Sequence, residues 1–155
     1  MTTALATSDF FFSAMIHLLI AVVCGGIIGL ERQLHRKAVG IRSCIIVVLT
    51  VTLMVDLGLE ATQAAGDPSR VMAAVITGVG FLGGGVILAQ GTRIQGVTTA
   101  TLIWALAAIG IAIGMGFGLA AVAMTVTVTA VALVVDLAEA RFPSLRREAD
   151  TGRES

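Results

Sequence analysis

The chain has 155 residues, of which 57% are hydrophobic and only 13% charged, and its mean hydropathy is +0.99. This composition excludes a water-soluble globular domain and is typical of a protein that crosses a membrane, so we expect the lipid bilayer to surround it. Ten Lys and Arg residues balance ten Asp and Glu residues, so no net charge favours nucleic acid or an acidic substrate as a partner.

Five long apolar runs follow one another along the chain. A helix needs about 20 apolar residues to cross a hydrocarbon core of about 30 Å, and the five runs are long enough. An open sheet would leave its edge groups without partners in lipid, and the alternating pattern of a β-barrel is missing. The predicted fold is therefore all-α, a polytopic membrane bundle (1–137) of five transmembrane helices over residues 10–30, 43–59, 71–89, 98–114 and 117–137, with a short tail, 138–155.

The first run lacks the basic flank of a cleavable signal peptide, so we expect it to be retained. Gly25 and Gly29 lie four residues apart on one helical face, a spacing that lets two helix backbones approach closely. Arg32 and Arg36 continue this face toward the first loop. His17, about a third of the way into the run, is expected to hydrogen-bond a neighbouring helix rather than to bind a ligand.

Glu31 leaves two interpretations open. It lies one turn from His35, with which it can form a surface pair. Alternatively, Glu31, Arg32 and Arg42 form a network that locks the first helix against the second. The basic residues of this loop also have a plainer use, as a topology signal and as contacts for anionic lipid headgroups.

Two residues of the second run, Cys44 and Asp56, need no functional explanation. Cys44, like Cys24 in the first run, lies among apolar residues, where a thiol is most often a packing residue, so no disulfide is expected. Asp56 is one turn from the outer end of the run and is close enough to reach the membrane interface.

The stretch "DPSR" before the third run predicts the start of a helix. Asp67 is a suitable N-cap, and Pro68 suits the first turn, where no N–H group is needed. Because this stretch stands at the entrance to a glycine-rich helix, Asp67 and Arg70 are also candidates for a role beyond capping.

The third run contains the spacing of a dinucleotide-binding loop at Gly78, Gly80 and Gly83. Such a loop needs a preceding strand and a water-exposed helix start, so its position inside a span excludes that interpretation. Gly80 and Gly84 are spaced for close packing against another helix. The succession Gly83, Gly84, Gly85 leaves a second possibility, a break at mid-depth whose carbonyls serve an ion, but packing is favoured.

The fourth and fifth runs are separated only by a few glycine-rich residues, which predicts a tight helical hairpin. Gly110, Gly114 and Gly118 are each four apart and predict further close contacts. Thr98 and Thr99, at the start of the fourth run, are candidates for lining a polar path, together with other threonines of the bundle: Thr77, Thr101, Thr125, Thr127 and Thr129.

The distribution of cations orients the chain. Nine of the ten fall in the first loop, the third loop and the tail: Arg32, Arg36, Lys37, Arg42, Arg93, Arg141, Arg146, Arg147 and Arg153. Only Arg70 falls on the other side. The positive-inside rule therefore places the C-terminus in the cytoplasm and the N-terminus outside.

No combination of residues typical of an enzyme is present, so we expect no enzymatic activity and no resident cofactor. A Mg²⁺ site usually takes one or two carboxylates and retains several waters. Asp56 and Asp67 are weak metal candidates on the outer face, and Glu31 is the only one on the inner face. None of them forms a clear pair in the sequence, so Mg²⁺ binding stays open.

Three blocks of sequence resemble the membrane domain of the MgtC/SapB family of bacterial inner-membrane proteins. They are "GGIIGLERQLHRKAVGIRS", "DPSRVMAAVITGVGFLGGGVIL" and "GVTTATLIWALAAIGIAIGMG", and the resemblance extends over about residues 24–118. It implies a role in magnesium limitation and in virulence, exerted by regulating other membrane proteins such as the proton-driven ATP synthase. Many members carry a soluble domain after the last helix, and the tail here is expected to be too short for one.

Two classes of function therefore remain open. A regulator needs only an outward apolar surface, whereas a transporter or channel for Mg²⁺ or another small ion needs a polar path. A homodimer is expected in either case, because the glycine faces outnumber those that an internal bundle needs and twofold pairing is the commonest assembly.

Overall fold

The computed structural model describes residues 2–62, 67–90 and 93–142. The elements follow in the order α1 (Thr2–Leu34), α2 (Ile41–Thr62), α3 (Pro68–Val86), β1 (Leu88–Gln90), β2 (Arg93–Gln95), α4 (Val97–Gly114) and α5 (Gly118–Arg141). Each helix contains a stretch long and apolar enough to cross a membrane. The helical multi-pass membrane fold is therefore confirmed. The side of the membrane on which each end lies stays a prediction.

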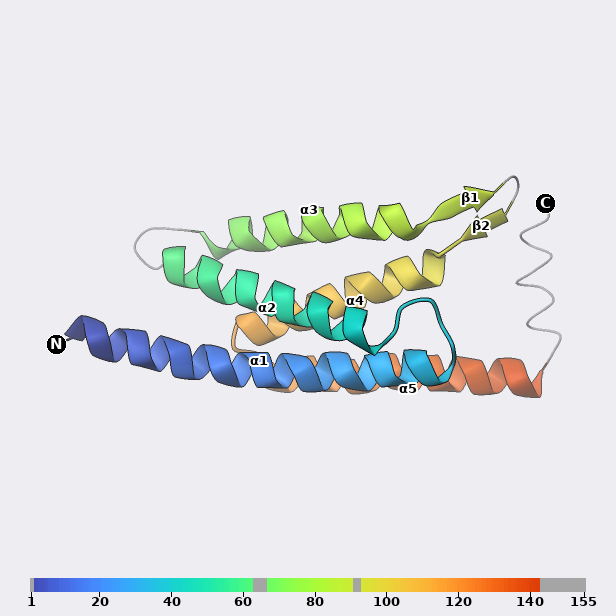
Figure 1. The fold of residues 1–155 in the computed structure, drawn as a ribbon, viewed down its shortest axis with the longest axis horizontal. Coiled ribbons are helices and arrows are strands. Elements are labelled where there is room, and N and C mark those ends of the chain that lie inside the picture. Colours follow the sequence, from blue (N-terminus) through green and yellow to red (C-terminus); the bar gives the residue numbers. More distant parts are fainter. Residues whose placement is uncertain (1, 63–66, 91–92, 143–155) are drawn as a thin grey trace.

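Helix α4 is the centre of the bundle. It contacts all four other helices, while α1 packs along α2 and α5, and α3 packs on the opposite side against α2 and α4 (Figure 1). Its span is also the most buried of the five. A helix surrounded in this way is apolar on all faces, as the sequence of α4 is.

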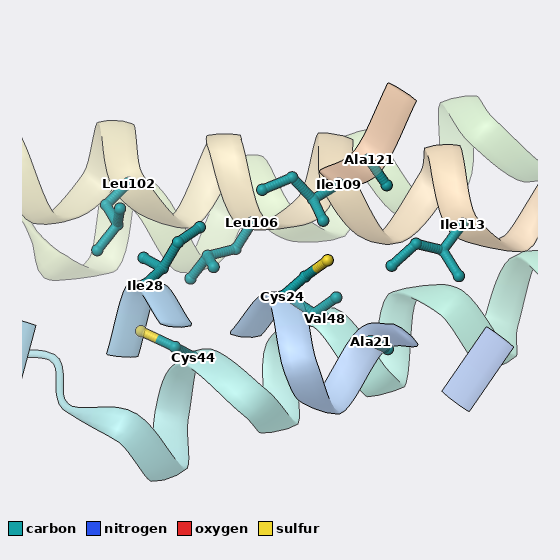
Figure 2. Packing of buried hydrophobic residues seen from close by; sticks show 10 residues of the cluster. All are labelled: Ala21, Cys24, Ile28, Cys44, Val48, Leu102, Leu106, Ile109, Ile113 and Ala121. Carbon is teal, nitrogen blue, oxygen red and sulfur yellow. The ribbon is translucent and has the colours of Figure 1, made fainter. Parts of the chain in front are cut away.

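The core lies where α1, α2 and α4 meet. Figure 2 shows the side chains of the three helices pointing toward one another, with Ala121 of α5 closing the cluster. Cys24 and Cys44 lie in this core as free, buried thiols, so the expectation of no disulfide is confirmed.

Glycines of α1 allow α2 to approach closely. A Cβ atom at Gly25 would lie 2.8 Å from the Cα of Ile45, and one at Gly29 would lie 2.5 Å from the Cα of Ile41. Both distances are too short for a real side chain, and the obstructing atoms belong to a backbone that cannot rotate away. The predicted packing role of Gly25 and Gly29 is confirmed.

Glycines of α4 form a second close contact, on the other face of α2. A Cβ atom at Gly110 would lie 2.8 Å from the Cβ of Val51, and one at Gly114 would lie 2.7 Å from the Cβ of Val55. The same pattern was predicted to continue to Gly118, and this is wrong. The chain reverses between α4 and α5, so Gly118 is not on the same helical face.

The glycines of α3 differ from the prediction in two ways. The helix is unbroken from Pro68 to Val86, so the proposed break at mid-depth is wrong. The contact face is formed by Gly80 and Gly83, which lie against the ring of Trp104 on α4, whereas nothing lies within 4 Å of a Cβ placed at Gly84 or Gly85. The bulky indole ring, rather than the four-residue spacing, sets how α3 is rotated.

The third predicted helix is three residues too long at its end. After Val86 the chain becomes extended, and β1 pairs with β2 in an antiparallel hairpin. Gly96 then starts α4 with a φ of 90°, and any Cβ there would overlap the carbonyl oxygen of Val86. The predicted hairpin of α4 and α5 is confirmed, with Gly116 at a φ of 82° in its turn.

Candidate functional site

Helix α1 ends in a reversal that places the next residues against α5. Arg36 has a φ of 53°, its N–H donates to the carbonyl of Gln33, and the N–H of Lys37 donates to the carbonyl of Arg32. This pattern is a Schellman cap, in which glycine is usual at the left-handed position. The reversal also means that Arg36 does not continue the glycine face of α1, contrary to the prediction.

Four charged or ionisable side chains meet beside this reversal, and we call them the α1–α5 cluster: Glu31, His35, Lys37 and Asp136. The Nζ of Lys37 lies 2.8 Å from Oδ1 of Asp136. The Nε2 of His35 lies 3.9 Å from Oδ2 of Asp136, and its Nδ1 lies 3.3 Å from Oε1 of Glu31. The cluster thus joins the end of α1 to the last turns of α5.

The two charged residues nearest the bundle interior are almost completely buried. The side chains of Glu31 and Arg32 are each only 6% exposed, so the predicted pair of Glu31 with His35 is present, but Glu31 is buried and not at the surface. Among the described residues, Oε1 of Glu31, Nε of Arg32 and Oδ2 of Asp136 are buried and have no hydrogen-bond partner. Burying such groups without partners costs stability, which makes this end of the bundle the candidate functional site.

Two adjoining hollows open beside the cluster. The larger, of about 340 Å³, lies between α1, α4 and α5, and its polar lining residues include Glu31, Arg32, Lys37, Asp136, Glu139 and Thr98. The smaller, of about 250 Å³, is lined by residues that include Arg32, Lys37, Thr98 and Thr99. Four residues singled out from the sequence, Glu31, Arg32, Thr98 and Thr99, are therefore brought together.

Arg42 does not join them. Its side chain is exposed at the start of α2, lines neither hollow, and forms no ion pair within the described part of the chain. The proposed network of Glu31, Arg32 and Arg42 that locks α1 against α2 is therefore wrong. Among the described residues, the ion pairs at this end lead to Asp136 of α5 instead.

Asp67 and Arg70 lie at the start of α3, at the other end of the bundle. The Asp67 carboxylate accepts hydrogen bonds from the Ser69 N–H at 2.9 Å and the Ser69 hydroxyl at 2.6 Å, which confirms it as the N-cap. These bonds hold the pKa of Asp67 below its usual value. Arg70 lines an apolar groove of about 710 Å³ between α2 and α3.

A second buried polar contact joins α1 to α2. The Nδ1 of His17 lies 2.8 Å from Oδ1 of Asp56, so the predicted hydrogen bond of His17 to a neighbouring helix is confirmed. Asp56 was predicted to reach the membrane interface, and this is wrong because it is only 6% exposed. Packing of α1 against α2 covers it, and His17 provides its partner.

Most threonines that were candidates for lining a polar path donate their hydroxyls to backbone carbonyls of their own helix. The hydroxyls of Thr77, Thr125 and Thr127 donate to carbonyls four residues earlier, and Thr101 donates to the carbonyl of Thr98. These bonds satisfy the hydroxyls locally. Of the threonines predicted to line a polar path, Thr98, Thr99 and Thr129 remain in the lining of the two hollows beside the α1–α5 cluster.

The sequence did not indicate that two members of the cluster, Lys37 and Asp136, belong to it. Lys37 and Asp136 are 99 residues apart, and no local sequence pattern predicts that α1 and α5 are neighbours. One signal was available, because Asp136 is a lone carboxylate in an otherwise apolar run, and ionisable residues within spans are costly and usually functional.

Comparison with known proteins agrees with this architecture. The family model of the MgtC family matches residues 18–141. The chain is 43% identical over 119 residues to an uncharacterized protein of Haemophilus influenzae, a match that covers 70% of this chain and 49% of that one. It is 39% identical over 103 residues to the "Putative magnesium transporter YhiD" of Escherichia coli K12, covering 62% and 48%. It is 33% identical over 99 residues to Protein MgtC of Salmonella typhimurium LT2, covering 64% and 42%.

The matched relatives are longer than this chain, which spans about half the length of the first two. No solved structure matches it. The family model covers most of the chain, including the reversal after α1, the glycine-rich α3 and the central α4. The chain therefore belongs to the MgtC family.

Proposed function

We propose that this protein acts in magnesium homeostasis, in adaptation to magnesium limitation, by regulating other proteins of the bacterial inner membrane rather than by carrying ions itself. The link to magnesium is supported by membership of the MgtC family and by the name of the Escherichia coli relative. The choice of regulation over transport rests on the interior of the bundle.

The main observation behind this choice is that apolar packing separates the two polar regions of the bundle, the His17–Asp56 contact and the α1–α5 cluster. His17, which contacts Asp56 of α2, and Glu31 both lie on α1, about 14 residues or about 21 Å apart at 1.5 Å per residue. Between them the buried residues are mainly apolar side chains and thiols, including Cys24, Val48, Leu106 and Ile109. The buried hydroxyls of Thr52 and Thr125 already donate to backbone carbonyls. An ion would lose its hydration there and find few replacement ligands in the described residues.

A regulator instead requires contact with another membrane protein. The bundle presents many large apolar side chains outward, on α1, α3 and α5, and in lipid such faces are available for helix packing. The family resemblance suggests the proton-driven ATP synthase as a partner to test first. A homodimer remains part of the proposal, with the open face at Gly84 and Gly85 as one place where a second copy can approach.

The magnesium link is tested by deleting the gene in the bacterium that encodes the chain. We expect slower growth at limiting Mg²⁺, normal growth at high Mg²⁺, and restoration by the intact gene. A matched gene carrying Asp136→Asn should restore growth less well than one carrying Glu139→Gln, because only Asp136 belongs to the α1–α5 cluster. Deletion cells that grow equally well at all Mg²⁺ concentrations would refute the proposal.

One observation favours the alternative, a Mg²⁺ or small-ion transporter. The larger of the two hollows is lined by three carboxylates, those of Glu31, Asp136 and Glu139, and such a hollow can attract cations from water. Because the core of the described bundle beyond it is mainly apolar, the hollow is better explained as a binding surface at one end. Flux through the purified protein distinguishes the two functions.

A further inference from the structure

We propose that Glu31, His35 and Asp136 form a reversible binding site for a divalent transition-metal ion, with Zn²⁺ as the best-suited member of the class. The inference stands independently of the proposed role in magnesium homeostasis. It rests on the geometry of the three side chains, on buried oxygen atoms that have no partner, and on the chemistry of the ligand set.

The three side chains are close enough to share one ion. One ligand atom from each lies within 4.8 Å of the other two. Ligand atoms that bind Zn²⁺ at about 2.0–2.1 Å in a tetrahedral site lie about 3.3 Å from one another. The Nε2 of His35 and Oδ2 of Asp136 are 3.9 Å apart, so this pair must close by only about 0.6 Å to reach that spacing. Oε1 of Glu31 lies 3.3 Å from Nδ1 of His35, so binding also requires the Glu31 carboxylate to turn toward Nε2.

The hydrogen bond of His35 presents its other nitrogen to the site. Its Nδ1 lies 2.9 Å from the backbone carbonyl oxygen of Glu31, which can only accept a hydrogen bond, so Nδ1 carries the proton. Nε2 is then left with a free lone pair on the side that faces Asp136. Metal-binding histidines are typically held in this way by a carbonyl or carboxylate acceptor.

Two carboxylate oxygens in the site lack any hydrogen bond among the described residues. Oε1 of Glu31 belongs to a side chain that is only 6% exposed, and Oδ2 of Asp136 is likewise buried. Lys37 occupies the other oxygen of Asp136, at 2.8 Å, and so fixes the carboxylate without blocking Oδ2. A bound cation would satisfy both oxygens, which otherwise remain buried at a cost.

The ligand types indicate the class of ion. One imidazole nitrogen with two carboxylate oxygens suits Zn²⁺, whereas Mg²⁺ prefers oxygen ligands in an octahedral arrangement and keeps much of its water. Three protein ligands leave a fourth position for water, as in open zinc sites.

Neighbouring charge and exposure predict reversible binding. Arg32 and Lys37 line the same hollow as Glu31, Asp136 and Glu139, so two positive charges offset part of the negative charge of the three carboxylates before an ion arrives. His35 is 37% exposed and Asp136 is 21% exposed, which lets water and ions exchange. The site is therefore suited to sensing a metal ion rather than to holding one permanently.

The test is calorimetric titration of the purified full-length chain in lipid nanodiscs with Zn²⁺, Mn²⁺ and Mg²⁺. We expect one Zn²⁺ per chain, bound more tightly than Mg²⁺. His35→Gln and Asp136→Asn should each weaken Zn²⁺ binding at least tenfold. Glu139→Gln removes a carboxylate from the same hollow but outside the ligand set, and should change the affinity less than threefold.

A second readout separates loss of the site from loss of the fold. Thermal unfolding should show that Zn²⁺ raises the melting temperature of the unaltered chain and of Glu139→Gln but not of His35→Gln, while the metal-free proteins unfold at similar temperatures. Equal Zn²⁺ affinity in His35→Gln, Asp136→Asn and the control, or the absence of saturable Zn²⁺ binding, would overturn the proposal. Mg²⁺ binding as tight as that of Zn²⁺ would overturn the assigned class of ion.

Discussion

Replacing Gly29 by alanine tests the close contact between α1 and α2. The added Cβ would lie 2.5 Å from the Cα of Ile41 and 3.1 Å from the Cβ of Cys44, so the helices must separate by about 1 Å to reach ordinary contact. Overpacking of this kind costs about 1–3 kcal/mol, and the better helix propensity of alanine returns about 1 kcal/mol at most. We therefore expect the free energy of unfolding to fall by about 1–2 kcal/mol.

Gly26 in the same helix provides the matched control. A Cβ at Gly26 would meet only the Cδ1 of Ile45, at 3.9 Å, so Gly26→Ala should be neutral or stabilising by up to about 1 kcal/mol. Unfolding by sodium dodecyl sulfate in mixed micelles can be followed through Trp104, the single tryptophan of the chain. If Gly29→Ala were as stable as Gly26→Ala, the close contact would not limit the packing of α1 on α2.

Four further measurements address other parts of the structure. Gly116→Ala, with open space around a Cβ but a φ of 82°, should lower the unfolding free energy by about 1 kcal/mol through backbone strain alone, and an unchanged value would contradict that conformation. Gly85→Ala should be neutral or slightly stabilising in the same assay, because nothing lies near it, whereas a clear loss would indicate a contact outside the single chain. The pKa of Asp67 is lowered from 3.8, so its capping contribution to stability is complete above pH 3.8 and is lost as the pH falls through the lowered pKa. The difference in unfolding free energy between the unaltered chain and Asp67→Ala should therefore shrink on acidification. A difference that grows would contradict the direction of the pKa shift. In intact cells, an impermeant thiol reagent should label a cysteine at Ser69 but not one at Arg141, and the opposite pattern would reverse the predicted topology.

Hydropathy and glycine spacing predicted much of the fold because both report local requirements. A run of about 20 apolar residues must cross lipid as a helix. Positions 25 and 29 must be glycine because the backbone of α2 lies close to them. The same spacing at Gly80 and Gly84 gave a wrong contact face. There the rotation of α3 depends on the shape of Trp104 in another helix, which no pattern within α3 contains.

The candidate site was predictable only in part, for a related reason. Glu31 and His35 are one turn apart and their pairing was predicted, but the burial of Glu31 and the approach of Asp136 depend on how the helices pack. Lys37 meets Asp136 only because the chain reverses at Arg36, which adopts a conformation usually occupied by glycine. Neither the order in which the helices pack nor the left-handed backbone conformation of Arg36 could be deduced from residue spacing.

Magnesium flux through the purified protein tests the central claim most directly. The chain is reconstituted into liposomes that contain a fluorescent Mg²⁺ indicator, with empty liposomes as the blank, and Mg²⁺ is added outside under both polarities of membrane potential. Because mainly apolar side chains pack between the two polar regions and the hydroxyls of the buried Thr52 and Thr125 are bonded to backbone carbonyls, we predict an influx equal to that of the blank. A saturable influx that increases with the amount of protein and is lost in Asp136→Asn would contradict regulation and establish transport.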